Sequence, residues 1–319
     1  MTDLLQNAGL PFAVAASCLI EAATGSPALF RGTVSHPVAW IGNLISFLEN
    51  HFNRQEWNFA TRRISGILCL LVLMSLSGGA GFLLDTLLGG SPWGLVLIAI
   101  IGSLGIAGRN LYEHVCAVLI PLREGNIAQA RQAVSMIVGR DTQQLDETGI
   151  STAACESLAE SFNDGFVAPL FWFLIGGLCG LFLYKTVNTA DSLIGHREPR
   201  WRAFGWAAAR MDDLMNLIPA RLAALLVIGA AAGKGWKVAW RDARKHASPN
   251  AGWPEAAFAG ALQCRFGGDV SYDGIPTERP FFGDGPKPDR ETLAGALPLY
   301  IRACLLTILL IIVIALVRL

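Results

Sequence analysis

Three carboxylates recur every four residues in ACESLAESFNDG (154–165), which runs directly into a long apolar segment. On a helix, Glu156, Glu160 and Asp164 would form one stripe, each acid one turn from the next. Like charges at this spacing repel. If the stripe is buried, a divalent cation or arginines must offset the repulsion, and Mg²⁺ suits hard oxygen ligands of this kind. The pattern therefore predicts either a magnesium site or an ordinary solvated helix face.

A second polar cluster follows the same apolar segment, in YKTVNTAD (184–191) and GHR (195–197). On a helix, Lys185, Asn188 and Asp191 share one face. With His196 and Arg197 they are typical of a phosphate-binding surface. Lys185 alone also has a simpler interpretation, as a cation that snorkels from the end of a membrane span.

A third cluster lies in ARMDDLMNLIPAR (209–221), where Asp212 and Asn216 are partners at four-residue spacing. With Asp213 they would make a second metal-binding carboxylate face. The alternative is that adjacent acids ahead of an apolar helix simply complement the helix dipole.

A fourth cluster occupies RDARKHASPNAGWPE (241–255). Ser-Pro-Asn is turn chemistry, and a helix is expected to start near Pro254. The cations and amides around Lys245 and His246 could hold an anion. The alternative interpretation, without a binding role, is a basic loop in contact with lipid headgroups.

Several sequence signatures are absent. The stretch GAAAGKG (229–235) has the wrong spacing for a P-loop and no hydroxyl residue after its lysine, so any nucleotide would be bound by another device. No HExxH or GxSxG motif is present. The seven cysteines form no CxxC pair, and most lie in apolar runs. They are expected to be small buried residues in a reducing setting.

The elements that position these clusters are expected to be membrane helices. The chain is 53% hydrophobic and 16% charged, whereas soluble domains carry roughly 25% charged residues; its mean hydropathy is +0.45. A bilayer core needs about 20 apolar residues in a helix. Five uncharged runs approach or reach that length: Leu4–Ile20, Ile64–Leu84, Pro92–Gly108, Gly165–Tyr184 and Ala303–Val317. The start, MTDLLQN, lacks a basic region, so the first run is expected to be a permanent helix.

We predict an all-α, polytopic integral membrane protein with a single membrane domain over residues 1–319. Its zero net charge gives no sign of a nucleic-acid partner.

The cations predict the topology. Residues 25–63, 109–165, 188–213 and 234–298 all carry Lys or Arg, and the positive-inside rule favours the cytoplasm for each. The segments 165–187 and 214–233 would then enter and leave on one side. Gly176-Gly177 and Pro219 make re-entrant or tilted segments the preferred interpretation. The alternative is that both segments cross and 188–213 lies outside. Segments 109–165 and 234–298 are expected to face the cytoplasm together, and 234–298 to be a loop-rich cap with one short helix near Pro254–Leu262.

Taken together, the motifs resemble one family, adenosylcobinamide-phosphate synthase, in the same order from about residue 20 to 285. They are HPVAWIGNLISFLE (36–49), SMIVGRDT (135–142), ESLAESFNDGFVAPLFWFLIGG (156–177), YKTVNTADSLIGHR (184–197), ARMDDLMNLIPARL (209–222) and RDARKHASPNAGWPEAAFAGAL (241–262).

The resemblance implies a multi-pass protein of the bacterial inner membrane with a cytoplasmic active site. It implies a ligase that uses ATP and Mg²⁺ to join a propionate of adenosylcobyric acid to the amine of (R)-1-aminopropan-2-yl phosphate, giving adenosylcobinamide phosphate. Membrane lipid and other cobalamin-assembly enzymes are its expected partners.

The sequence departs from the family pattern at a few positions. Glu21 and Gly25-Ser26-Pro27 stand where the family usually shows Asp and Gly-Asp-Pro, Ser161 follows Glu160 in place of Asn, and Cys179 replaces a frequent proline. The principal acids are kept, so activity is expected.

The mechanism expected from this resemblance divides the residues by role. The residues expected to bind magnesium are Glu156, Glu160, Asp164, Asp212 and Asp213. The residues expected to be catalytic are Glu156, Glu160 and one of His196 and His246. That histidine would transfer a proton. The residues expected to bind substrate and phosphate are Lys185, Asn188, Asp191, Arg197, Arg210, Lys245, Ser248 and Asn250.

A transporter or carrier of an anionic metabolite is the alternative function, since broken helices and intramembrane charges mark such proteins. The polar motifs gather at helix ends and in loops, and no inverted repeat is evident, which favours the enzyme.

Overall fold

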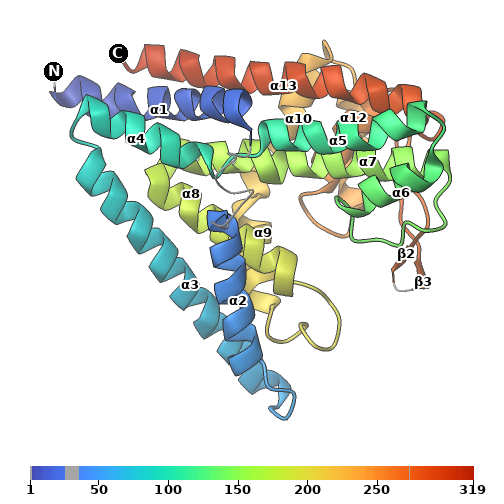
Figure 1. Ribbon diagram of the computed structural model, residues 1–319, viewed down its shortest axis with the longest axis horizontal. Helices are drawn as coiled ribbons and strands as arrows, with labels where there is room; N and C mark the ends of the chain where they lie inside the picture. The colour runs from blue at the N-terminus through green and yellow to red at the C-terminus, as the bar shows by residue number, and fades with distance from the viewer. Residues whose placement is uncertain (1, 26–35, 273) are drawn as a thin grey trace. The chain divides into compact units, whose positions relative to one another are not determined.

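The computed structural model describes residues 2–25, 36–272 and 274–319, and most of them are helical (Figure 1). The helices are α1 (Thr2–Thr24), α2 (Pro37–Phe52), α3 (Phe59–Leu88), α4 (Pro92–Ser103), α5 (Gly108–Arg123), α6 (Ile127–Ser135), α7 (Glu147–Phe162), α8 (Ala168–Ile194), α9 (Trp206–Met215), α10 (Leu217–Ala230), α11 (Trp236–Asp242), α12 (Gly252–Ala261) and α13 (Arg290–Val317). A π-helical turn (Asn163–Val167) links α7 to α8, and a 3₁₀ turn (Ala243–Lys245) follows α11. The short strands are β1 (Phe266–Gly267), β2 (Val270–Tyr272), β3 (Ile275–Thr277) and β4 (Phe281–Phe282).

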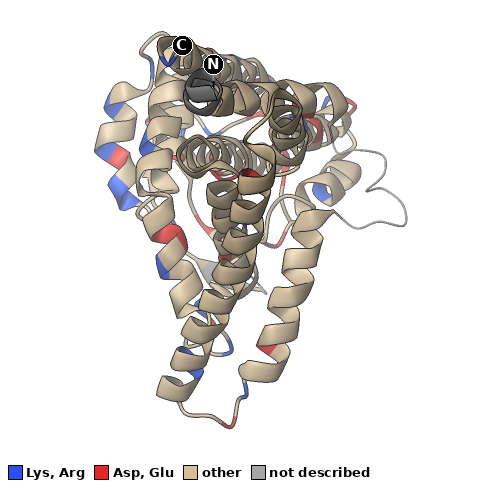
Figure 2. Cartoon of the chain, turned by 90° about the vertical axis from the view of Figure 1, so that its left-hand side faces the viewer, with Lys and Arg blue, Asp and Glu red and all other residues tan. Residues whose placement is uncertain are grey.

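Four helical segments are long and apolar enough to cross a membrane: Phe59–Leu88, Pro92–Arg123, Glu147–Ile194 and Arg290–Val317. The bent pair α9 and α10 makes a fifth if it is counted as one span, and Gly9–Thr24 in α1 is a shorter apolar helix. Few charged residues interrupt the long helices (Figure 2). The predicted class of a polytopic helical membrane protein is confirmed.

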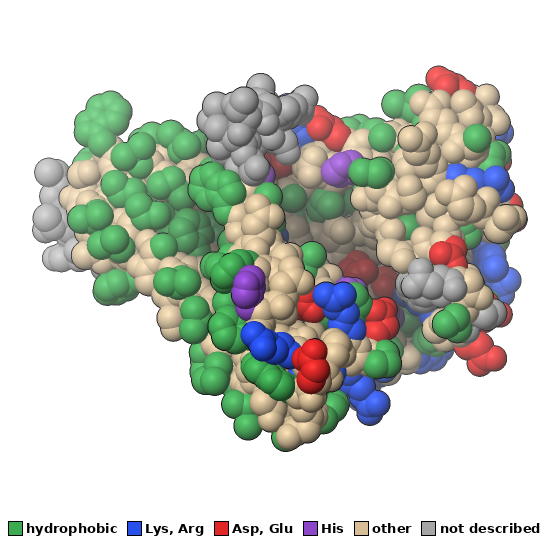
Figure 3. Space-filling model, turned by 60° about the horizontal axis from the view of Figure 1, so that its bottom comes forward, with side chains coloured by type: hydrophobic (Ala, Val, Ile, Leu, Met, Phe, Trp, Pro, Cys, Tyr) green, Lys and Arg blue, Asp and Glu red, His purple; other side chains and the backbone are tan. Residues whose placement is uncertain are grey.

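The outer surface of α3 shows why this class fits. Leu68, Leu71, Leu76 and Leu83 are all more than half exposed, and apolar side chains gather on the face that Figure 3 shows. In water such a patch would be a liability. In a bilayer it is the surface that lipid covers.

Helix starts follow local chemistry. Asn58 and Ser91 accept hydrogen bonds from the amides of Thr61 and Gly94, which caps α3 and α4. Pro92 stands in the first turn of α4, where its missing N–H costs nothing. The turn between α3 and α4 carries no charge.

The chain forms two compact units. Unit 1 comprises residues 1–107, 168–216 and 310–319, and unit 2 comprises residues 108–167 and 217–309. The single membrane domain expected from the sequence stays a prediction.

Unit 1 is built around α8, which packs against α1, α2, α3, α4 and α9. Its helical geometry breaks at Gly176 (φ −125°) and Gly177 (φ +60°, ψ −152°). At this break the carboxylate of Asp85, from α3, accepts the amides of Leu178 and Cys179, each at 3.0 Å. The glycine pair therefore breaks the helix, and an acid from another helix caps its second half; the predicted re-entrant or tilted path of this segment stays a prediction.

Unit 2 surrounds α12, which is buried from Gly252 to Ala259 and packs against α7, α10 and α11. Phe162 of α7 contacts Phe258 and Tyr300 edge to face, with ring centroids 6.2 and 5.7 Å away. Strand β1 pairs with β4 and β2 with β3, both antiparallel.

The prediction for segment 234–298 needs correction. Its helix near Pro254 is present and begins at Gly252, but the segment also contains α11, the 3₁₀ turn, all four strands and the start of α13. Strands of two or three residues are too short for a two-residue hydrophobic period to reveal.

Candidate functional site

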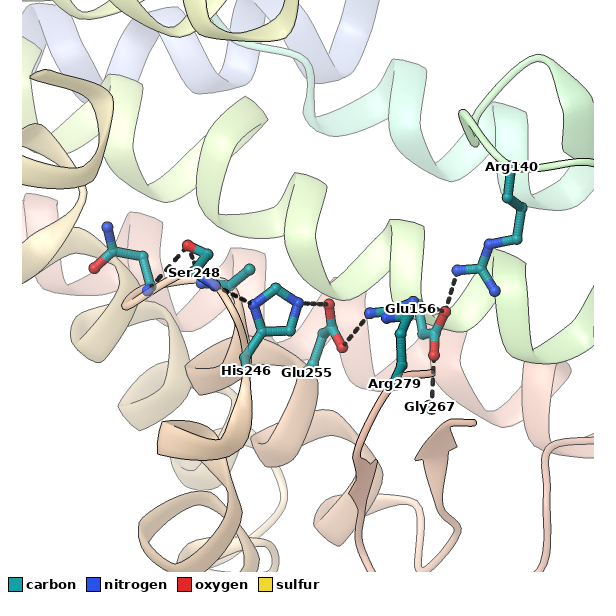
Figure 4. Close-up of polar contacts among 9 residues, drawn as sticks. Arg140, Glu156, His246, Ser248, Glu255, Gly267 and Arg279 are labelled. Atoms are coloured by element: carbon teal, nitrogen blue, oxygen red, sulfur yellow. Dashed lines mark hydrogen bonds and ion pairs between the residues drawn. The ribbon is translucent and has the colours of Figure 1, made fainter. Parts of the chain in front are cut away.

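The centre of the polar network in unit 2 is Glu156, which is buried in α7 (Figure 4). Its Oε2 pairs with Arg140 and, at 3.1 Å, with Nη1 of Arg279. Its Oε1 accepts the amide of Gly267 at 2.7 Å. Of the two ways to offset the charge of a buried acid, the fold uses arginines at this position.

Arg279 links this carboxylate to a second one. Its Nη2 lies 3.4 Å from Oε2 of Glu255, which is buried in the first turn of α12. Burial raises the pKa of Glu255 well above its ordinary value, and the charges of Glu156 and Glu160 add to the effect, while Arg279 opposes it.

His246 closes the network on the far side of Glu255. Its Nε2 lies 3.7 Å from Oε1 of Glu255, and its Nδ1 accepts the amide of Ser248 at 2.9 Å. A ring nitrogen that accepts a hydrogen bond carries no proton, so the neutral ring has its proton on Nε2. Burial lowers the pKa of His246, and the charge of Arg279 lowers it further.

The loop after His246 is fixed by its own turn chemistry. The Oγ of Ser248 accepts the amides of Asn250 and Ala251 at 3.2 and 3.4 Å. The side chain of Asn250 in turn accepts a hydrogen bond from Nη1 of Arg221, on α10, at 2.8 Å. The predicted Ser-Pro-Asn turn is confirmed, and its side chains hold the loop in place.

Lys245 lies beside a carboxylate that the sequence did not single out. Asp242 is fully buried and receives hydrogen bonds from Arg241 (2.8 and 2.6 Å) and from the amide of Gly283 (2.9 Å), with Nζ of Lys245 2.6 Å away. The hydrogen bonds from Arg241 hold the pKa of Asp242 well below its ordinary value, although burial opposes them. Lys245 thus neutralises Asp242 here, and its predicted phosphate role stays a prediction.

In unit 1 the second and third sequence clusters meet. Nδ2 of Asn188 donates to Oδ1 of Asp212 at 3.3 Å, and Nδ2 of Asn216 donates to its Oδ2 at 3.0 Å. The hydroxyl of Tyr184 donates to Oδ1 of Asn216 at 3.2 Å. The predicted pairing of Asp212 with Asn216 is confirmed, and α8 and α9 share one polar surface.

Further charges surround Asp212. Nη1 of Arg210 lies 3.0 Å from Oδ2 of Asp213. Asp191 is within electrostatic range of Asp212, Asp213, His196 and Arg210. His196 contacts the ring of Trp201, with centroids 5.4 Å apart, and Lys185 acts electrostatically on His36. Arg197 is exposed after the end of α8.

The loop that carries His196 and Arg197 is anchored within unit 1. Arg200 binds the buried carboxylate of Glu49 through two hydrogen bonds of 3.0 and 2.9 Å. Nδ2 of Asn53 also donates to Glu49, at 3.0 Å, and Arg62 donates to Oδ1 of Asn53 at 2.9 Å. Burial would raise the pKa of Glu49, but the hydrogen bonds from Arg200 and Asn53 lower it below its ordinary value.

The predicted carboxylate stripe is only partly preserved. Glu156 is buried and Glu160 is exposed on the same helix, whereas Asp164 lies beyond its end, in the π-helical turn, and accepts a hydrogen bond from Asn163 at 2.7 Å. A π-helical turn bonds over five residues, so the four-residue register is lost before Asp164. Asp212 and Asp213 belong to unit 1 and these three acids to unit 2, so a metal site shared by all five stays a prediction.

The hydrogen bonds that the carboxylates already accept bear on the predicted magnesium site. Among the residues that the structure describes, no group of three or more His, Cys, Asp or Glu is arranged to hold a metal ion. Glu156 already accepts three N–H groups from two cations and an amide. Each oxygen of Asp212 accepts a hydrogen bond from an asparagine side chain, and Asp191 and Asp213 act on it electrostatically. Magnesium often needs only one or two carboxylates when phosphates complete its shell, and which of the five predicted acids would bind it stays a prediction.

Sequence reasoning missed three members of the network in unit 2: Arg140, Glu255 and Arg279. The first two lie inside motifs that the sequence analysis used, SMIVGRDT and RDARKHASPNAGWPE, but neither was singled out there. Arg279 lies in an irregular Gly- and Pro-rich segment that offers no periodic signal. Glu21 is buried in α1, and Ser26 lies outside the described residues.

Comparison with known proteins gives these clusters a context. Residues 14–300 match the family described as CobD/Cbib protein. The chain belongs to this family. The membership predicted from the motifs is thus confirmed.

Its relatives in the CobD/Cbib family match nearly end to end. The chain is 46% identical over 289 residues to a protein of Rhodobacter capsulatus named cobalamin biosynthesis protein CobD, covering 89% of this chain and 90% of that one. Proteins of the same name from Sinorhizobium sp and Brucella suis are 43% and 44% identical; the matches cover 86% of this chain and 87% and 86% of theirs. No solved structure matches the chain.

Proposed function

We propose that this CobD/Cbib protein acts in cobalamin biosynthesis as a membrane-bound acid–amine ligase. It would join a propionate carboxylate of adenosylcobyric acid to the amine of (R)-1-aminopropan-2-yl phosphate, with consumption of ATP, to give adenosylcobinamide phosphate. The observation that carries the proposal is the match, over about nine tenths of both chains, to relatives named for cobalamin biosynthesis.

The reaction needs an activated acid, because a carboxylate oxygen is a poor leaving group. ATP bound with Mg²⁺ would supply the phosphoryl group that activates it. The protein must then screen crowded anionic charge and keep the attacking amine neutral.

The polar surface of unit 1 supplies the screening. Asp212, oriented by hydrogen bonds from two asparagine side chains, would hold magnesium together with phosphate oxygens of the substrates. The cations of this surface would hold phosphate oxygens: Lys185, Arg197 and Arg210. Asn188 and Asn216 would keep the metal-binding carboxylate in one orientation, as hydrogen-bonded outer partners do in metal sites.

The network of unit 2 supplies proton transfer. Burial raises the pKa of Glu255 above its ordinary value, so this carboxyl group holds a proton more readily than an exposed glutamate and would take part in proton transfer. His246, which is neutral and directs Nε2 at Glu255, would hold that group in place. Glu160, exposed on α7, acts electrostatically on Glu255 and would contact substrate and assist this proton transfer.

The proposal is tested with purified protein in detergent. Adenosylcobyric acid, aminopropanol phosphate and Mg-ATP are added, and mass spectrometry follows the amide product and ADP. We expect product only when all three are present. Absence of product, under conditions in which an established synthase works, would refute the ligase.

A transporter of an anionic metabolite is the second candidate, and one observation favours it. A membrane-spanning segment broken at Gly176–Gly177, with the carboxylate of Asp85 at the break, is a feature of transporter binding sites. Uptake of aminopropanol phosphate into proteoliposomes without ATP consumption would support this candidate over the ligase.

A further inference from the structure

A pocket of about 570 Å³ lies in unit 2, and none of its described lining residues belongs to the network around Glu156. It is formed by the end of α10, the turn that follows, the start of α11 and the end of α12. Lys234 and Lys237 line it, and no carboxylate is among its described lining residues. Both lysines are exposed, so their charges act on the pocket and its opening.

The shape of this pocket is set by close backbone contact. A Cβ on Gly235 would come within 2.6 Å of the carbonyl of Ala257, and one on Gly260 within 2.6 Å of Cα of Gly235. Glycine at these positions lets the start of α11 lie directly on α12. The pocket is therefore a fixed feature of the packing of these two helices.

Backbone strain gathers at the same place. Within the described part of the chain, the non-glycine residues with positive φ are Ala232 (52°) and Gln263 (56°). Gln263 lines the pocket, and Ala232 directly precedes Gly233, which also lines it. Strained backbone tends to occur where a binding surface requires it.

Exposed tryptophans adjoin the pocket. Trp236 lines it and stacks on Trp240 with centroids 4.1 Å apart, and the two residues are 48% and 47% exposed. Trp240 also contacts Trp253, which lies beneath the guanidinium of Arg221. Half-exposed tryptophans beside lysines at the end of an apolar helix are typical of the membrane–water interface.

The preceding helix supports this placement. α10 belongs to a candidate span, and Ile218, Leu222 and Leu225 are exposed along it. Apolar side chains exposed on a spanning helix face lipid tails, so the lysines that follow the helix lie at the level of the headgroups.

We propose that this pocket binds the phosphate headgroup of an anionic phospholipid of the surrounding membrane. Two ammonium groups without an opposing carboxylate complement one phosphate, and the tryptophan rings lie against the glycerol and upper acyl region. A nucleoside triphosphate fits less well, because it brings Mg²⁺ and the pocket offers no carboxylate for that ion. The inference is independent of the ligase proposal.

The test is native mass spectrometry of the full-length protein, released from detergent containing phosphatidylglycerol or phosphatidylcholine. We expect phosphatidylglycerol to be retained, and the double variant Lys234→Ala/Lys237→Ala to lower its retention roughly tenfold. The matched control is Arg265→Ala/Lys287→Ala, which removes two exposed cations of the same unit that do not line the pocket. It should retain lipid as the wild type does.

Three results would overturn the proposal: equal retention of both lipids by the wild type, unchanged retention in the lysine variant, or release of ATP or inorganic phosphate instead of lipid. A second measurement does not require the lysine variant to fold. Brominated phosphatidylglycerol should quench tryptophan fluorescence of the wild type more than brominated phosphatidylcholine does, and Trp236→Phe should remove part of that quenching. Equal quenching by the two lipids would also contradict the site.

Discussion

Glu156 shows how a repulsive set of acids becomes tolerable in a membrane protein. Two charges taken out of water lose hydration that their mutual attraction only partly returns, so a buried ion pair adds little net stability. The ion pairs of Arg279 instead fix the positions of helices. Arg279 binds Glu156 and Glu255 at once, so it holds α7 and α12 to the segment that carries the arginine. Loss of one member leaves the others buried and uncompensated.

Glu156→Gln is therefore expected to destabilise the protein. It removes the charge that faces Arg140 and Arg279, and breaking a buried pair in this way costs about 3–5 kcal/mol. Thermal unfolding in detergent, followed by fluorescence, measures the effect. Glu147→Gln, on the same helix but partly exposed and 3.9 Å from Arg290, is the control and should melt as the wild type does. Equal melting temperatures for both variants would show that the network is not structural.

Glu160→Gln is expected to lower activity without lowering stability. Glu160 is exposed, so its replacement should leave the melting temperature unchanged, whereas amide formation should fall by roughly 100-fold or more, as expected for a group that assists proton transfer. Turnover in the ligase assay and melting are measured on the same preparation. Wild-type turnover would remove Glu160 from the site.

Asp242 gives a prediction for pH. Its pKa is lower in the folded protein than in the unfolded chain, chiefly because of the hydrogen bonds from Arg241. The folded state then binds fewer protons, so the carboxylate stabilises the fold above the ordinary value of 3.8 and this contribution is lost as the pH falls below it. Wild type should lose melting temperature below about pH 4, whereas Asp242→Asn should start lower at pH 7 and change less on acidification. Parallel melting curves for the two proteins from pH 7 to pH 3 would contradict this account.

At the scale of elements, the break in α8 decides where the residues after it point. The segment beyond Gly177 carries Lys185, Asn188 and Asp191, so its direction places one side of the polar surface of unit 1. Asp85 holds that segment by accepting its first free amides, as a capping side chain does at a helix start.

The two glycines at the break allow a matched comparison. Gly177 has φ +60° and ψ −152°, and a Cβ there would lie 2.6 Å from Oδ2 of Asp85. Gly177→Ala is expected to cost about 1–3 kcal/mol through backbone strain alone. Gly176 has φ −125° and nothing within 4 Å of an added Cβ, so Gly176→Ala should be nearly neutral. Thermal melting of the two variants decides, and equal effects would mean that the break does not depend on the left-handed glycine.

The same elements show what sequence could and could not predict. Apolar runs close to the length of a bilayer predicted the spans, and a glycine pair inside one of them lies at the break in α8. Hydropathy and backbone freedom are local properties, so the sequence carries both. The partner of that break, Asp85, lies 93 residues from Leu178 and has no local signature. Arg279 is likewise 123 residues from Glu156. The π-helical turn that removes Asp164 from the stripe depends on packing that no single-residue preference encodes.

At the scale of the whole molecule, charge distribution predicts orientation. The turn at Gly89–Trp93 carries no charge, whereas the connections around Glu124 and Lys287 belong to segments rich in cations. Cytoplasmic loops carry an excess of Lys and Arg. Alkaline phosphatase, which is active only outside the cytoplasm, should therefore be active when fused after Gly90 and inactive when fused after Glu124 or Lys287. Green fluorescent protein at the same sites should give the reverse pattern, and phosphatase activity after Lys287 would place the network around Glu156 on the wrong side for cytoplasmic ATP.

The connection between α8 and α9 separates the two topologies that the cations leave open. Its arginines favour the cytoplasm, which requires the broken α8 segment to return to the side from which it entered. A full crossing would instead put His196, Arg197 and the aspartates of α9 outside, away from ATP. Fusions after Glu198 should therefore be fluorescent and lack phosphatase activity. An active phosphatase at Glu198, with Lys287 still cytoplasmic, would contradict the re-entrant interpretation and would put Lys185, Arg197 and Asp212 out of reach of their proposed ATP substrate.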